Sequence, residues 1–94
     1  AFKLSVPYPN PFNPITNIEY SLQYSSNVSL IIYDLLGKQI EILHNGMQHP
    51  SNYTIKWDAS LYSSGIYFVQ LIIQDTKTID TSHIVQIQKM VLLK

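Results

Sequence analysis

The sequence predicts an all-β fold, an antiparallel β-sandwich of about seven strands in two sheets. Apolar and polar residues alternate with a period of two along several segments, as in strands with one buried face. Turn-forming residues separate these segments about every 8–12 residues, which is typical of sandwiches. No stretch of about ten residues has the 3.6-residue period of a helix.

The first two strands are expected on either side of a turn at residues 25–27, Ser-Ser-Asn. The strand before this turn alternates over residues 17–24, and its inward face is Ile18, Tyr20, Leu22 and Tyr24. The strand after it has the inward face Val28, Leu30 and Ile32. Its outer face, with Ile31 and Tyr33, is unusually apolar for a surface.

Two turns are expected around the third strand, which we place at residues 39–44. Residues 34–38 predict a tight connection that begins at Asp34, and Gly37 can adopt the positive φ that such a turn requires. Asn45-Gly46 is the strongest two-residue turn signal in the chain and predicts the end of this strand.

The next segments predict an amphipathic strand and then a central one. In the fourth strand Tyr53, Ile55 and Trp57 alternate with polar residues, and Asp58 ends it. A loop over residues 60–65 leads to a run from Gly65 to Ile73 that includes Tyr67. This run is apolar on both sides, as expected between two neighbours in a sheet. Residues 75–78 predict a further turn.

The alternation of apolar and polar residues changes phase within the last segment, residues 85–92. Val85 and Ile87 share one parity, whereas Met90 and Leu92 share the other, so an unbroken strand would expose one of the pairs. We expect a bulge near residues 88–89, or the meeting of two strands there.

A lead-in rich in proline and asparagine, residues 1–16, precedes a sandwich over residues 17–94, and together they predict one domain. Each proline ring fixes φ and pushes the residue before it into an extended conformation. The lead-in is therefore expected to be stiff, extended and turning. Its central residues are Pro9, Asn10, Pro11, Phe12, Asn13 and Pro14.

Composition excludes several classes of protein. The 94 residues have zero formal charge and contain no arginine, which argues against nucleic-acid binding. Cysteine is absent, so the fold resembles an immunoglobulin-like domain without its disulfide. No apolar run is long enough to cross a bilayer, and the first residues lack a signal peptide. We expect a fragment of a longer chain, or a protein that is not exported by itself.

Side chains that could support chemistry are scattered. The three histidines have no neighbouring carboxylates at a metal-binding spacing, and no serine lies in a nucleophile motif. Asp34 and Asp58 end strands, where a carboxylate commonly accepts backbone N–H bonds. We expect no catalytic residue, no metal and no cofactor. Trp57 is expected in the core, with a partner for its indole N–H.

Five blocks of sequence, in order, resemble a known family. They are residues 8–20 around Pro-Asn-Pro-Phe-Asn-Pro, residues 28–38, residues 57–59 (Trp-Asp-Ala), residues 64–68 (Ser-Gly-Ile-Tyr-Phe) and the terminal block Lys89, Met90, Val91, Leu92, Leu93 and Lys94. The chain resembles the C-terminal sorting domain of type IX (Por) secretion substrates, and is similar to the immunoglobulin-like part of flagellar hook-capping proteins. Ser51 and the length of residues 76–88 depart from the family pattern.

The resemblance implies a non-catalytic export tag. Its partners would be the outer-membrane translocon, sortase-like components and a covalently linked upstream cargo, and its destination the cell surface or the medium. The terminal block would be the address, offering a short apolar strand for edge pairing with a receptor. Two alternatives stay open. One is an accessory domain that acts as a spacer or binds polysaccharide through exposed aromatic residues, and the other is a hook-cap-like structural domain.

Overall fold

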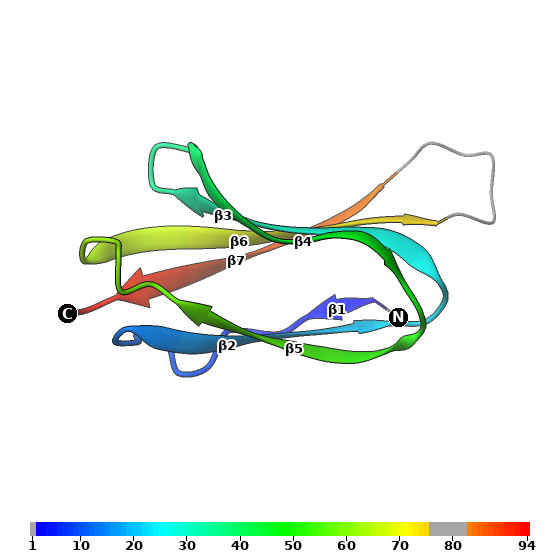
Figure 1. Ribbon diagram of the computed structural model, residues 1–94, viewed down its shortest axis with the longest axis horizontal. Coiled ribbons are helices and arrows are strands. Elements are labelled where there is room, and N and C mark those ends of the chain that lie inside the picture. Colours follow the sequence, from blue (N-terminus) through cyan, green and yellow to red (C-terminus); the bar gives the residue numbers. More distant parts are fainter. Residues whose placement is uncertain (1, 76–82) are drawn as a thin grey trace.

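Seven strands form from the alternating segments, and the computed structural model describes residues 2–75 and 83–94 of the chain (Figure 1). The predicted all-β fold is confirmed: the strands make two antiparallel sheets, and the described residues contain no helix. The strands are β1 (Lys3–Leu4), β2 (Ile15–Leu22), β3 (Ser26–Asp34), β4 (Gln39–Gln48), β5 (Ser51–Asp58), β6 (Gly65–Asp75) and β7 (Ile84–Leu92).

The two sheets lie face to face, in the orders β1-β2-β5 and β4-β3-β6-β7 (Figure 1). The predicted central position of the β6 segment is confirmed, since β6 pairs with both β3 and β7. The inward sets of β2 and β3 are buried as expected, except that Tyr24 lies beyond the end of β2. Burial of these apolar faces drives the sheets together. The core consists of Leu4, Phe12, Ile18, Tyr20, Leu22, Val28, Leu30, Ile32, Trp57, Ala59, Tyr67, Val69, Leu71, Ile73, Met90 and Leu92.

Two predicted turns are misplaced. Ser26 begins β3, so the chain turns over residues 23–25. The turn predicted at Asn45-Gly46 is wrong, because β4 continues through these residues and pairs them with Ser29 and Val28. An Asn-Gly turn joins neighbouring strands of one sheet, whereas β5 lies in the opposite sheet. The chain crosses between the sheets at His49-Pro50 instead.

The bulge predicted in the last segment is also absent, since β7 pairs with β6 in one continuous register from Ile84 to Leu92. The strand buries Met90 and Leu92 and places Val85 and Ile87 on its outer face, 49% and 54% exposed. The register shifts lie in the β3–β4 pair. Of the turn predicted at residues 75–78, Asp75 is the last residue of β6 and the others lie outside the described residues.

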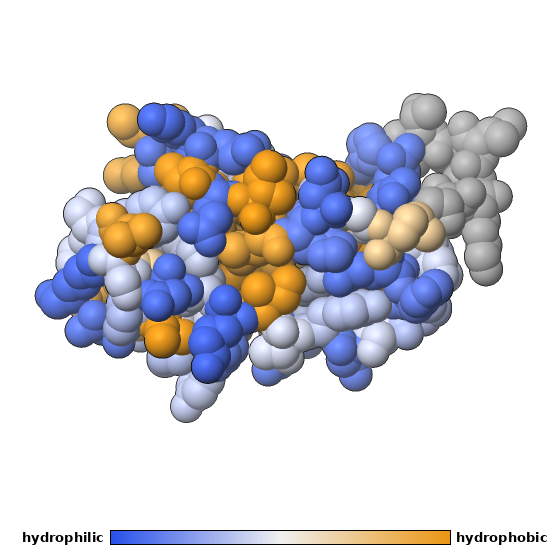
Figure 2. Space-filling view, viewed as in Figure 1, coloured by the Kyte–Doolittle hydropathy of each residue, from blue (hydrophilic) through white to orange (hydrophobic). Residues whose placement is uncertain are grey.

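The two long sides of the sandwich differ. Figure 2 shows apolar side chains across the middle of the side where β4 and β5 lie. The partly buried hydrophobic residues of these strands that pack against the core are Ile40, Leu43, Tyr53 and Ile55. On the opposite side, where β7 faces β1 and the lead-in, polar groups join the two sheets.

Candidate recognition site at the edge of the terminal strand

The terminal block is divided between core and surface by the pleat of β7. Met90 and Leu92 point inward and are fully buried, and Met90 pairs with Tyr67 of β6. Lys89 and Val91 point to the other face, because successive side chains of a strand alternate. The inward half of the predicted address therefore belongs to the core.

The lead-in covers the free edge of this block. The Asn10 side chain takes the place of a strand: its Nδ2 donates to the Lys89 carbonyl at 2.9 Å, and its Oδ1 accepts the Val91 N–H at 2.9 Å. Two residues further, the Phe12 N–H donates to the Val91 carbonyl and the Phe12 carbonyl accepts the Leu93 N–H, both at 2.9 Å. The Pro-Asn block and the terminal block, far apart in sequence, thus form one structure.

Two glutamines continue this seam toward the other end of β7. Gln86 accepts the Leu4 N–H through Oε1 at 2.6 Å and donates from Nε2 to the Phe2 carbonyl at 3.0 Å. Gln88 donates from Nε2 to the Leu4 carbonyl at 3.1 Å. We call Asn10, Gln86 and Gln88 the amide seam. Amides suit this position because each one carries both a donor and an acceptor.

The lead-in is held in place by anchors at both ends and in its middle. Tyr8 and Asn17 exchange backbone hydrogen bonds, and the Pro14 carbonyl accepts the Ala59 N–H. Between them the Phe12 ring is buried against Trp57, at a centroid separation of 5.6 Å. Residues with fixed φ lose little conformational entropy on taking this extended path. Removing the lead-in from the edge would expose an aromatic core residue.

Asp34, Gly37 and Asp58, which the sequence analysis singled out, lie at turns where their side chains or backbone order the chain. Asp34 Oδ1 accepts the N–H groups of Leu36 and Lys38 at 3.0 and 2.9 Å, and Gly37 takes φ = 84° in this turn, as expected. Asp58 accepts the backbone N–H and the hydroxyl of Ser60. These bonds from Ser60, with a smaller contribution from Lys94, lower the pKa of Asp58 below its ordinary value.

Lys94, the last residue of the sequence, is hydrogen-bonded to Ser60 and Ser64 in the loop between β5 and β6. The Lys94 N–H donates to Ser64 Oγ at 2.9 Å, and its Nζ donates to the Ser60 carbonyl at 2.6 Å. Leu93, between this anchor and the buried Leu92, is 57% exposed. The outward residues that a partner can contact are therefore Lys89, Val91 and Leu93, with the stem of Lys94.

Trp57 lies at the centre of an aromatic cluster under this end. Its ring contacts Phe12, Tyr62 and Tyr67 at centroid separations of 5.6, 5.8 and 5.7 Å. The expected partner for its indole N–H is not found, since Nε1 is buried without a hydrogen bond within the described residues. Burial and the nearby Glu41 raise the pKa of Tyr62, whose hydroxyl donates to Glu41 Oε1 at 2.9 Å.

Gly65, the remaining turn residue singled out by sequence, is the first residue of β6.

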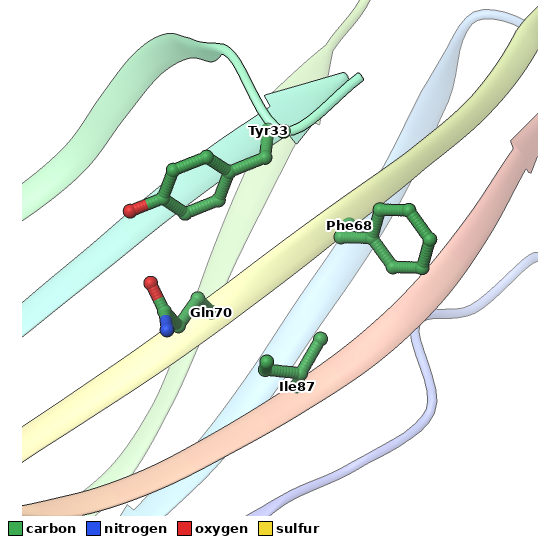
Figure 3. Close-up of a pocket in the computed structure, with 5 residues that line it drawn as sticks. Tyr33, Phe68, Gln70 and Ile87 are labelled. Carbon is green, nitrogen blue, oxygen red and sulfur yellow. The ribbon is translucent and has the colours of Figure 1, made fainter. Parts of the chain in front are cut away.

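Sequence reasoning missed a hollow on the outer face of the four-stranded sheet. Residues of β3, β6, β7 and the β3–β4 turn line it: Tyr33, Gly37, Phe68, Gln70 and Ile87 (Figure 3). Its volume is about 460 Å³. The phase change in the last segment was the signal that could have found it, because it places Ile87 on this face.

Neither a metal site nor a membrane-spanning helix is found in the part of the chain that the structure describes. Its His, Asp and Glu side chains form no group of three or more that could hold a metal ion. No helix there has the length and apolar character needed to cross a bilayer.

Comparison with known proteins decides the family. Residues 6–87 match the family described as the secretion system C-terminal sorting domain. The chain belongs to this family. The sorting domain carries the signal for type IX secretion, its proteins are secreted or displayed at the cell surface, and the family is non-catalytic in general. No curated protein and no solved structure gives a significant match.

The matched range covers the lead-in from Val6 onward, the amides Asn10 and Gln86, and the sandwich as far as Ile87 within β7. The terminal block from Lys89 to Lys94 follows the end of the match. Its recognition role is an expectation of the resemblance.

Proposed function

We propose that residues 1–94 form a single sorting domain that directs a covalently linked upstream cargo through the periplasm and the outer membrane, to the cell surface or the medium. Its partners are the translocon and the sortase-like components of type IX secretion. The domain performs no chemistry on the cargo, and needs no cofactor. The family match over residues 6–87 is the observation that carries this proposal.

The folded domain suits such a role because its terminal strand is held independently of any cargo. The lead-in, β1 and the Ser60–Ser64 loop bond β7 and Lys94 from within the same chain. A tag of this kind presents the same surface on unrelated cargoes. We propose that the machinery reads the outward residues of the terminal block, Lys89, Val91, Leu93 and Lys94.

Edge pairing with the terminal block, the mode suggested by its sequence, meets an obstacle in the lead-in. A partner strand would have to displace Asn10 and withdraw Phe12 from the core, and large-to-small changes at such aromatic residues cost about 3–5 kcal/mol. The geometry therefore favours contacts with outward side chains of the intact sandwich.

Export of a reporter tests the function. A periplasmic reporter with residues 1–94 fused at its C-terminus is expected in the medium or at the surface of a type IX-competent host. The same fusion is expected to stay in the periplasm of a strain that lacks the translocon. Equal export from both strains, or retention in both, would contradict the proposal.

Truncation of the terminal block is a poor test of its role. Deleting residues 90–94 removes Met90 and Leu92 from the core, so lost export would follow from unfolding as readily as from a lost address. Substitutions of the outward residues alone separate the two effects.

A further inference from the structure

The outer face of the four-stranded sheet is apolar over its centre. Ten apolar side chains lie on this face by the strand register: Ile31, Tyr33, Ile42, Met47, Ile66, Phe68, Ile72, Val85, Ile87 and Val91. Lys89, paired with Phe68, carries the only formal charge on this face among the described residues. Partly and largely exposed apolar side chains gathered on one face of a sheet indicate an interaction site.

The hollow lies within this surface and gives it shape. Figure 3 shows Tyr33, Phe68, Gln70 and Ile87 around a common space on three neighbouring strands. Gly37 also lines the space, and its lack of a side chain keeps that side open. Ile87 is more than half exposed and pairs with Gln70. The one amide side chain that lines the hollow therefore lies next to Ile87.

The extent of this face favours a transient protein partner over a permanent second copy. A sheet face four strands wide and about nine residues long covers roughly 600 Å². Stable specific interfaces bury about 800 Å² per partner, so this face alone matches the low end of specific contacts.

The charge on this face and its position indicate which chemical group the partner carries. The single charge on this face is positive and lies beside the hollow, since Lys89 pairs with Phe68, which lines the hollow. A carboxylate opposite Lys89 is the complementary group. The face is also continuous with the outward half of the terminal block, because Lys89 and Val91 belong to both.

We propose that this outer face is a docking surface for a protein of the secretion machinery, which inserts a large apolar side chain into the hollow and places a carboxylate opposite Lys89. The proposal rests on the function proposed above and extends its recognition surface from the terminal block to Phe68 and Ile87, which lie before the block in sequence.

The reporter fusion tests the docking surface with two kinds of variant. Ile87→Asp introduces a charge at the hollow, and we expect exported reporter to fall about tenfold or more, as for a central interface residue. Lys89→Glu is expected to lower the export rate and Lys89→Gln to lower it less. Lys56→Glu, a matched reversal at an exposed position of β5, is expected to leave export unchanged.

Folding and self-association are measured on the same purified domains. Ile87→Thr keeps a residue suited to strands while reducing the apolar contact, and its thermal midpoint should stay near that of the unchanged domain. An export defect in this variant with an unchanged midpoint supports docking.

The outcomes separate the two proposals. No export of the unchanged fusion overturns both. Full export of Ile87→Asp and Ile87→Thr, beside normal export of the unchanged fusion, overturns only the docking surface. A dimer in sedimentation that Ile87→Asp dissociates would assign the face to a second copy and would also overturn it.

Discussion

Asn10 Oδ1 accepts the backbone N–H of Val91 at 2.9 Å, although the two residues are 81 positions apart in sequence. With the second bond, from Asn10 Nδ2 to the Lys89 carbonyl, one side chain occupies the position of an edge strand beside the terminal block. The lead-in is thus part of the structure that presents the block.

Asn10→Ala should lower the free energy of unfolding by about 1–3 kcal/mol, because the partly buried Val91 N–H loses its acceptor. Chemical denaturation measures this change. Asn13→Ala is the matched control, since the exposed Asn13 side chain makes no hydrogen bond within the described residues, and its effect should stay within about 0.5 kcal/mol. Equal effects of the two substitutions would show that the amide does not stabilise β7.

Substitutions of Trp57 should separate ring packing from the indole N–H. Trp57→Ala is expected to cost about 3–5 kcal/mol, since it leaves a cavity among three aromatic rings. Trp57→Phe should cost less than half as much, because it keeps a ring and removes a buried N–H without a partner. Similar losses in both variants would indicate that Nε1 has a partner, such as a buried water.

The β3–β4 turn depends on the backbone of Gly37. Gly37→Ala should cost about 1–2 kcal/mol, since an L-residue is strained at φ = 84°. A Cβ there meets no atom within 4 Å, so the cost arises from the backbone alone. Gly37→Asn should therefore cost less than Gly37→Ala, because asparagine tolerates positive φ. Denaturation curves that rank Asn as the worse substitution would contradict this explanation.

Asp58 should give the domain a pH-dependent contribution to stability. Its pKa is lower in the folded state than the ordinary 3.8, so the contribution is present above that value and is lost as pH falls through the folded-state pKa. The stability difference between the unchanged domain and Asp58→Asn should thus shrink as the solution is acidified from about pH 5 to pH 2. A difference that is constant over this range would contradict the pKa shift.

The sequence predicts the sheets well where one face alone is apolar. Ile18, Tyr20 and Leu22 are buried as expected, since their polar neighbours leave one orientation for the strand. The β6 segment, apolar on both sides, is equally recognisable as a central strand.

Prediction fails where tertiary context overrides a local signal. Asn45-Gly46 favours a hairpin, but β5 lies in the other sheet and β4 continues. The predicted bulge rests on the assumption that Ile87 must be buried together with Met90 and Leu92. In the structure Ile87 lies on the outer face of the four-stranded sheet, so no bulge is needed. Pairing of Asn10 with β7 joins opposite ends of the chain, and no local pattern encodes it.

The central claim is that the machinery reads the outward side of a folded terminal block. Its most direct test is the exported fraction of a reporter fusion carrying Lys89→Ser, Val91→Thr, Leu93→Ser and Lys94→Ser, which keeps Met90 and Leu92 in the core. We predict lost export from a domain that still unfolds cooperatively, whereas unchanged export of this variant would contradict the claim.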